Sequence, residues 1–215
     1  LDTMDPMTLS IYAAEHHIMG NIRFVIYYAL PVGISFYTFQ TMSYTIDVFY
    51  GRCEPERNLG KFALFISYFP QLVAGPIERF SHLQPQLLAK HFPTYENFSK
   101  GFRLLIFGFF VKVCIADNLA IWADAIYTEP GLYIKPHVWL GTFIFGIQIY
   151  CDFSGYTLIA QGSAMLMGIR LMDNFRTPYL SSSVTEFWQR WHISLSTWFG
   201  DYLFIPLGGS RVGVP

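Results

Sequence analysis

A run of about 23 residues from Phe24 to Ile46 carries no formal charge, and this feature limits the possible folds of the chain more than any other. As a helix, the run is long enough to cross a hydrocarbon core about 30 Å thick. The composition agrees, because 53% of the residues are hydrophobic and only 13% are charged, whereas soluble domains carry roughly 25% charged residues. The formal net charge of -1 supplies no basic field that would attract nucleic acid. We therefore predict an integral membrane protein that does not bind nucleic acid.

Further apolar segments follow along the chain. Leu104 to Ala123 and Val138 to Ile169 are each long enough to cross a membrane as helices, and the loop between them, Asp124 to Pro136, is poor in basic residues and is predicted to lie outside. Phe62 to Ile77 is short, contains prolines and has basic residues on both sides, which predicts a re-entrant hairpin. The last segment, Phe187 to Leu207, carries three tryptophans, which favours a shallow or interfacial helix over a span.

These segments predict an all-α fold, a multi-spanning integral membrane helical bundle with re-entrant and interfacial helices, and residues 1–215 read as a single membrane-embedded unit. The positive-inside rule places Gly51 to Lys61, Glu78 to Arg103 and Arg170 to Arg190 in the cytoplasm. Because the chain opens at Leu1 and stops at Pro215, directly after a glycine-rich turn, we expect an internal fragment of a longer protein.

Ionisable residues inside apolar segments are the candidates for chemistry, since a charge in lipid is costly by about 2.5 to 3.5 kcal/mol. Asp47 lies at the end of the first span, where a water-exposed helix end and a functional role are both open. Lys112 either extends to the interface or faces the bundle. Asp152 interrupts a long apolar segment, which indicates either a polar cavity or a structural hydrogen bond between helices. No grouping of ligand residues predicts a metal site.

His192 is the fourth such candidate. An imidazole titrates near neutrality, so it can take a proton from a hydroxyl group and return it, as acyl transfer to a sugar alcohol requires. The alternative is an amphipathic anchor at the membrane interface, because aromatic residues flank this histidine on both sides.

The residues around His192 resemble the signature of the membrane-bound O-acyltransferases. The segment Trp188–Trp198 (WQRWHISLSTW) is followed by Asp201-Tyr202-Leu203 and by Ile205–Gly209 (IPLGG). Other matching stretches are Leu30–Gln40 (LPVGISFYTFQ), Phe69–Ile77 (FPQLVAGPI) and Asp152–Tyr156 (DFSGY). Within the family the chain most resembles the alginate O-acetyltransferase branch, over about residues 30–209.

The resemblance implies a multi-span helical enzyme of the bacterial cytoplasmic (inner) membrane with a tunnel or funnel through its core. An acyl thioester, either acetyl-CoA or an acyl carrier protein, would deliver an acetyl group from the cytoplasm to hydroxyls of an exopolysaccharide such as alginate. The donor is a substrate, and no bound cofactor is expected. The implied partners are membrane lipid, the donor or its carrier, and extracytoplasmic polysaccharide-acetylating proteins.

The resemblance also assigns residues. His192 matches one of the family's two motif histidines, and the second belongs downstream of the glycine turn, in a segment this chain lacks. The role of His192 is therefore either general base or support of the tunnel wall. Asp152, Asn174, Trp188 and Asp201 are expected to line the polar path and bind substrate. Gly200 stands where the family usually has arginine, and loss of that guanidinium is expected to remove a partner for an anion or a carboxylate, of which Asp201 is the nearest in sequence.

Two other functions stay open at this stage. In the first, the chain is a transporter or channel subunit in which Asp47, Asp152 and His192 form a proton or solute path. In the second, it is an inactive remnant without the second motif histidine. Dependence on a thioester donor separates an acyltransferase from a transporter.

Overall fold

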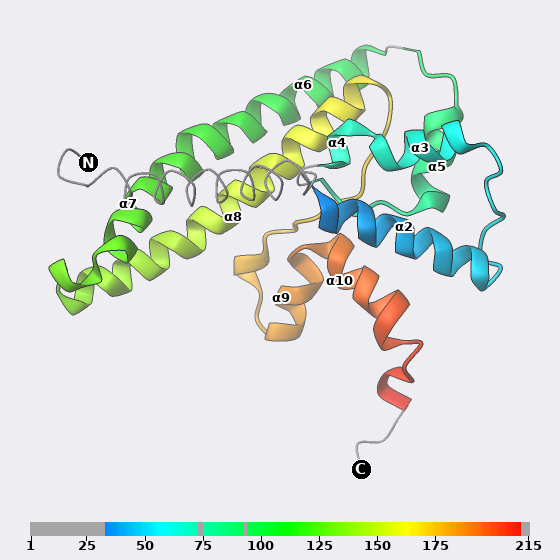
Figure 1. Cartoon of the computed structure of the whole chain (residues 1–215). Coiled ribbons are helices and arrows are strands. Elements are labelled where there is room, and N and C mark those ends of the chain that lie inside the picture. The colour runs from blue at the N-terminus through cyan, green and yellow to red at the C-terminus, as the bar shows by residue number, and fades with distance from the viewer. Residues whose placement is uncertain (1–32, 73–74, 93, 212–215) are drawn as a thin grey trace, which may run out of the picture. The chain divides into compact units, whose positions relative to one another are not determined.

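A computed structural model describes residues 33–72, 75–92 and 94–211. The chain divides into two compact units, Leu1–Ile34 and Ser35–Pro215, and nearly all described residues belong to the second. The described regular structure is helical, as the sequence predicts. Its elements are α2 (Ile34–Phe49), α3 (Leu59–Ser67), α4 (Phe69–Leu72), α5 (Phe80–Leu88), α6 (Tyr95–Phe109), the π-helix η1 (Phe110–Ala116), α7 (Asp117–Thr128), the 3-10 turn η2 (Pro130–Leu132), α8 (Lys135–Leu166), η3 (Pro178–Leu180), α9 (Val184–Arg190), α10 (Ile193–Phe199), the π-helix η4 (Gly200–Phe204) and η5 (Gly209–Arg211) (Figure 1).

Two continuous helices in the described part have the length and apolar composition of membrane spans. The first runs through α6, η1 and α7 over 34 residues, Tyr95–Thr128, and the second is α8, with 32 residues. Thr94 caps the first helix by accepting a hydrogen bond from the Asn97 amide at 3.2 Å. The first helix contains the predicted span Leu104 to Ala123, and α8 covers the predicted span Val138 to Ile169 except for its last three residues. Of the other predicted span, the part up to residue 32 lies outside the described residues, and the remainder forms α2, with 16 residues.

The α6 and α8 helices run antiparallel and side by side, and glycines set their close approach (Figure 1). Gly101 faces Gly162, and Gly108 faces Gly155 one heptad further along each helix. A methyl group on Gly162 would lie 2.8 Å from the Gly101 carbonyl oxygen, and one on Gly155 would lie 3.1 Å from the Gly108 oxygen. In lipid, small residues stabilise helix pairs because they let the backbones touch. The pairing places Tyr95 and Leu166 at the same end of the two helices.

We expect Gly162→Ala to destabilise this helix pair by about 1–3 kcal/mol, because the new methyl group meets backbone atoms, which cannot move aside. Gly146→Ala in the same helix is the matched control, since its nearest non-local neighbour would be the Tyr179 hydroxyl at 3.9 Å. Thermal unfolding of the full-length protein in detergent measures both variants. Equal melting temperatures for Gly162→Ala and Gly146→Ala would contradict the close-packing argument.

Short helices pack around the end of α8 and form the main buried core. Phe65 of α3 and Leu83 of α5 are fully buried and pack with Ala160 and Ala164 of α8. The apolar segment that is predicted to be re-entrant is broken at Tyr68, which has extended backbone angles between α3 and α4. The break agrees with a segment too short to cross, and its entry into the membrane stays a prediction.

Two boundaries differ from the sequence prediction. The segment Phe187–Leu207 is not one interfacial helix, because the chain turns at Trp191 and His192 between α9 and α10. The predicted loop Asp124–Pro136 is shorter than expected, since α7 continues to Thr128 and α8 begins at Lys135. Apolar patterning reports burial in lipid or protein, and it does not register a turn within a stretch rich in aromatic residues.

Candidate functional site

His192 occupies a turn with unusual backbone geometry. Its φ angle is +43°, in the left-handed region that non-glycine residues seldom adopt. The residue caps the N-terminus of α10, where its carbonyl oxygen accepts hydrogen bonds from the amides of Leu195 and Ser196, both at 3.0 Å. A strained conformation persists only where surrounding contacts hold it. The turn therefore fixes the direction of the His192 side chain.

The His192 ring lies in an aromatic environment. Its centroid is 4.7 Å from that of Phe153 on α8, at an interplanar angle of 81°, and 6.5 Å from that of Phe36 on α2. The Nε2 atom is buried and has no hydrogen-bond partner in the part of the chain that the structure describes. Burial lowers the pKa of His192 from 6.5 to about 4, because the protonated ring would lose hydration. At neutral pH the imidazole is uncharged, and Nε2 is able to accept a proton.

The lowered pKa predicts a pH dependence of stability. Between pH 6.5 and 4 the unfolded chain binds a proton at His192 that the folded protein does not, so stability falls as the pH falls through this window. His192→Asn, which tolerates the left-handed turn and does not titrate there, is expected to lose less melting temperature between pH 7 and pH 5 than the wild type. The exposed His137→Asn serves as control. An identical drop in wild type and His192→Asn would contradict a buried neutral ring.

Hydrogen bonds of Asn174 and Ser194 stabilise the turn at His192. The Ser194 hydroxyl donates to Asn174 Oδ1 at 2.6 Å, and the amide of Ile77 donates to the same hydroxyl oxygen at 3.0 Å. The Ile193 amide donates to the Asn174 carbonyl oxygen at 3.0 Å. Asn174 is only 1% exposed and Ser194 is fully buried. Asn174, which the sequence predicts beside the polar path, is thus placed where it fixes the start of α10.

The short segment Ile77–Arg79 connects three separate parts of the structure. Ile77 bonds to Ser194 as described, Glu78 accepts from the Met172 amide at 2.5 Å, and Arg79 pairs with Asp201 at 3.1 Å. Glu78 is fully buried, and His82 Nδ1 lies 2.6 Å from its second oxygen. This hydrogen bond raises the pKa of His82.

Sequence reasoning missed Glu78 and treated Arg79 only as a basic flank. The available signal was the position of both charges directly after the apolar segment that ends at Ile77. A buried carboxylate is stable only where amides or cations form hydrogen bonds with it. The amide that binds Glu78 is 94 residues away in the chain, so the sequence pattern does not reveal it.

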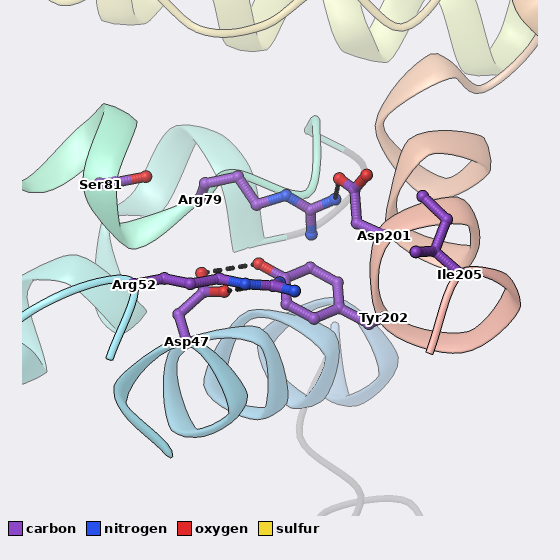
Figure 2. Close-up of a pocket in the computed structure, with 7 residues that line it drawn as sticks. All are labelled: Asp47, Arg52, Arg79, Ser81, Asp201, Tyr202 and Ile205. Atoms are coloured by element: carbon purple, nitrogen blue, oxygen red, sulfur yellow. Dashed lines mark hydrogen bonds and ion pairs between the residues drawn. The ribbon is translucent and has the colours of Figure 1, made fainter. Parts of the chain in front are cut away.

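A charged cluster surrounds Tyr202 (Figure 2). The Tyr202 hydroxyl donates to Asp47 at 2.7 Å, and Arg52 lies 3.4 Å from the other oxygen of that carboxylate. Asp47 is 8% exposed, so it is not the water-exposed helix end that one reading of the sequence gave. Asp201 pairs with Arg79 at 3.1 Å, so it has a guanidinium partner although position 200 is a glycine.

A second charged group lies between the two long helices. Lys112 Nζ is 2.6 Å from Asp152 and also pairs with Asp117. It also lies 5.2 Å from the centre of the Tyr156 ring. Lys112 thus faces the helix pair, and Asp152 is part of an ion pair between helices. The predicted role of Asp152 in a polar path beside His192 stays a prediction.

Trp188 is placed apart from the His192 ring contacts. It lies half exposed on α9, where its ring packs on Phe187 with 5.6 Å between centroids. An apolar cavity of about 330 Å³ lies between η1 and α8, and Phe175, one of its lining residues, packs on Phe153 at 5.0 Å. Phe153 in turn packs on His192, so ring contacts connect a residue of the cavity lining to the histidine.

The described residues thus contain two helices with the length and composition of membrane spans and a histidine whose buried Nε2 is a candidate proton acceptor. The sequence profile of MBOAT, the membrane-bound O-acyltransferase family, matches residues 56–214. The chain belongs to this family, as the sequence resemblance indicates.

Curated relatives agree with this assignment. The chain is 47% identical to a probable alginate O-acetylase AlgI of Pseudomonas syringae over 91% of the chain and 38% of that protein. It is 36% identical to a peptidoglycan O-acetyltransferase of Helicobacter pylori, over 85% of the chain and 40% of the relative. It is 31% identical to a teichoic acid D-alanyltransferase of Bacillus subtilis, over 81% of the chain and 45% of that relative. The chain thus spans less than half the length of these relatives.

Proposed function

We propose that the protein containing this chain is an O-acyltransferase that moves an acetyl group from a cytoplasmic thioester to hydroxyls of a cell-envelope polysaccharide. The observation that carries the proposal is the buried, neutral Nε2 of His192, without a hydrogen-bond partner among the described residues, within a chain of this family. A general base must be uncharged before it reacts, and His192 meets this requirement at neutral pH.

The reaction uses His192 as a proton carrier. The acceptor hydroxyl transfers its proton to Nε2 while its oxygen bonds to the acyl carbon of the thioester. The carbon–sulfur bond then breaks, and the leaving thiolate takes the proton back from the imidazolium. Burial makes the imidazolium unstable, which favours its return to the neutral form after each cycle.

The acceptor, the setting and the partners follow the relatives' names and the sequence. The acceptor that we propose is alginate, because the relative with 47% identity is named as a probable alginate O-acetylase. The proposed location is the bacterial cytoplasmic membrane. The proposed partners are membrane lipid, acetyl-CoA or an acyl carrier protein on the cytoplasmic side, and polysaccharide-acetylating proteins on the other side.

Donor dependence tests this proposal. Membrane vesicles that contain the full-length protein are supplied with radiolabelled acetyl thioester and acceptor polymer, and label in the recovered polymer is measured. An acyltransferase incorporates label only when donor is present. A transporter, the alternative that the charged residues in apolar segments suggest, moves solute in proteoliposomes without donor and leaves the polymer unlabelled. That second pattern would refute the proposal.

A further inference from the structure

A pocket of about 350 Å³ opens beside the charged cluster on Tyr202 (Figure 2). Its lining residues include two arginines, two carboxylates, a tyrosine and a serine. These residues are Asp47, Arg52, Arg79, Ser81, Asp201 and Tyr202. They come from α2, the loop after it, the start of α5 and η4, so the pocket exists only in the folded chain. The positive-inside rule predicts that the residues Arg52, Arg79 and Ser81 face the cytoplasm.

Arg79 is a fixed cation with spare hydrogen-bonding capacity. Its side chain is 12% exposed, its Nη2 donates to Asp201 at 3.1 Å, and its guanidinium carbon lies 4.5 Å from the centre of the Tyr202 ring. The other terminal nitrogen, Nη1, is buried and has no hydrogen-bond partner among the described residues. Figure 2 shows this nitrogen directed away from Asp201 and toward the Tyr202 ring. Because Nη1 lies against the ring, the nitrogen that can reach an incoming oxyanion is Nη2, which now donates to Asp201.

Arg52 provides a second cation at the same ring. Its guanidinium carbon lies 5.9 Å from the Tyr202 ring centre, and its side chain is 48% exposed. Two guanidinium groups thus converge on one aromatic side chain, with the Ser81 hydroxyl among the lining groups. Arginine forks and a hydroxyl are a combination that suits the tetrahedral oxygens of a phosphate.

The two carboxylates of the pocket differ in how firmly they are held. Asp47 is buried and is bound by both Tyr202 and Arg52. Asp201 is 52% exposed and makes its ion pair with Arg79 alone among the described residues. An exposed carboxylate with one partner is held weakly, since exposed ion pairs contribute about 0 to 1 kcal/mol. An incoming anion is able to displace Asp201 from Arg79.

We propose that Arg79, Arg52 and Ser81 form a binding site for a phosphate group. In the absence of phosphate, the Asp201 carboxylate occupies Arg79 and so competes with the ligand. The inference rests on the proposed function, to which it adds the residues that would bind the phosphate of the cytoplasmic acyl donor. A phosphate of this kind also occurs in lipid headgroups and as the free ion, and the experiment separates these sources.

If the Asp201 carboxylate competes with the phosphate for Arg79, removing Asp201 and removing an arginine should change the affinity for coenzyme A in opposite directions. Binding of coenzyme A to the full-length protein in phosphatidylcholine nanodiscs is measured by calorimetry. Asp201→Asn removes the competing charge and is expected to tighten binding about threefold or more, whereas Arg79→Gln and Arg52→Gln are expected to weaken it about tenfold. Arg57→Gln, an exposed arginine of the same loop outside this pocket, is the matched control and leaves the affinity unchanged. Because Asp201 and Arg52 are about half exposed, their variants are expected to fold even if Arg79→Gln does not.

Competing probes identify the phosphate source. Pantetheine, which has the thiol arm of coenzyme A without its phosphates, is expected to bind much more weakly than coenzyme A. If inorganic phosphate or phosphatidylglycerol in the nanodisc binds instead, with the same dependence on the three variants, the phosphate site stands and the donor assignment fails. Equal competition by acetate would overturn the phosphate specificity, and equal affinity in all variants would overturn the site. His192→Ala is expected to bind coenzyme A normally, so loss of acylation and loss of this site are distinguishable.

Discussion

Replacement of His192 by alanine in the full-length protein is expected to abolish O-acetylation of the polysaccharide while the protein stays in the membrane at wild-type levels. Without the imidazole, the acceptor hydroxyl has no proton acceptor at this position and remains a weak nucleophile at neutral pH. Loss of a general base lowers the rate by about 10² to 10⁴-fold, which removes detectable product in cells. The measurement is the O-acetyl content of the secreted polymer at matched membrane levels.

Two comparisons make the result specific to the imidazole. His192→Asn preserves the left-handed turn and is also expected to be inactive, which separates loss of the ring from loss of the turn. His137→Ala, at the exposed first turn of α8, is expected to retain full acetylation. Acetylation that persists in both His192 variants would make this residue a structural anchor and would assign the proton transfer to another residue.

Replacement of Lys112 by methionine is expected to destabilise the paired long helices by about 2.5 to 3.5 kcal/mol, the cost of leaving an unpaired charge on an apolar helix in lipid. Asp152 and Asp117 would then lie close together without their shared cation. Asp152 belongs to the apolar helix α8, where an unpaired charge in lipid is unfavourable. The thermal stability of the purified protein and its level in membranes report the change.

Lys100→Met is the matched control, because Lys100 forms an ion pair with Glu96 at 2.6 Å on the same helix but both side chains are more than half exposed. Its loss is expected to change stability by about 0.3 to 0.5 kcal/mol. The double variant Lys112→Met with Asp152→Asn is expected to recover part of the stability. If Lys112→Met and Lys100→Met behave alike, the ion pair between the long helices contributes little, and Lys112 only occupies space.

The long helices could be predicted because their signal is local. A stretch such as Val138–Ile169 has the length and apolar character of a spanning helix whatever it packs against, and α8 follows it closely. Family membership was also predictable, because the motif around His192 is contiguous in sequence. These features need no knowledge of which residues meet in space.

The contacts of the candidate site were not predictable in this way. Lys112 and Asp152 are 40 positions apart, and Arg79 and Asp201 are 122 positions apart. Their pairing depends on how the helices pack, which composition and spacing do not encode. The turn at His192 was missed for a different reason, since its left-handed backbone is held by Asn174 and Ile77 from distant segments.

The segment Ile77–Arg79 has a consequence for how the protein opens. Its three successive residues attach to Ser194, Met172 and Asp201, so none of these parts can separate without breaking a bond to the same short stretch of chain. Local unfolding proceeds in cooperative units defined by such shared contacts. The amide hydrogens of Ile77 and Met172, each bonded to a buried acceptor, should therefore exchange with solvent slowly and at matching rates. The segments that carry His192 and Arg79 would then open as one unit, although more than 100 residues separate them along the chain.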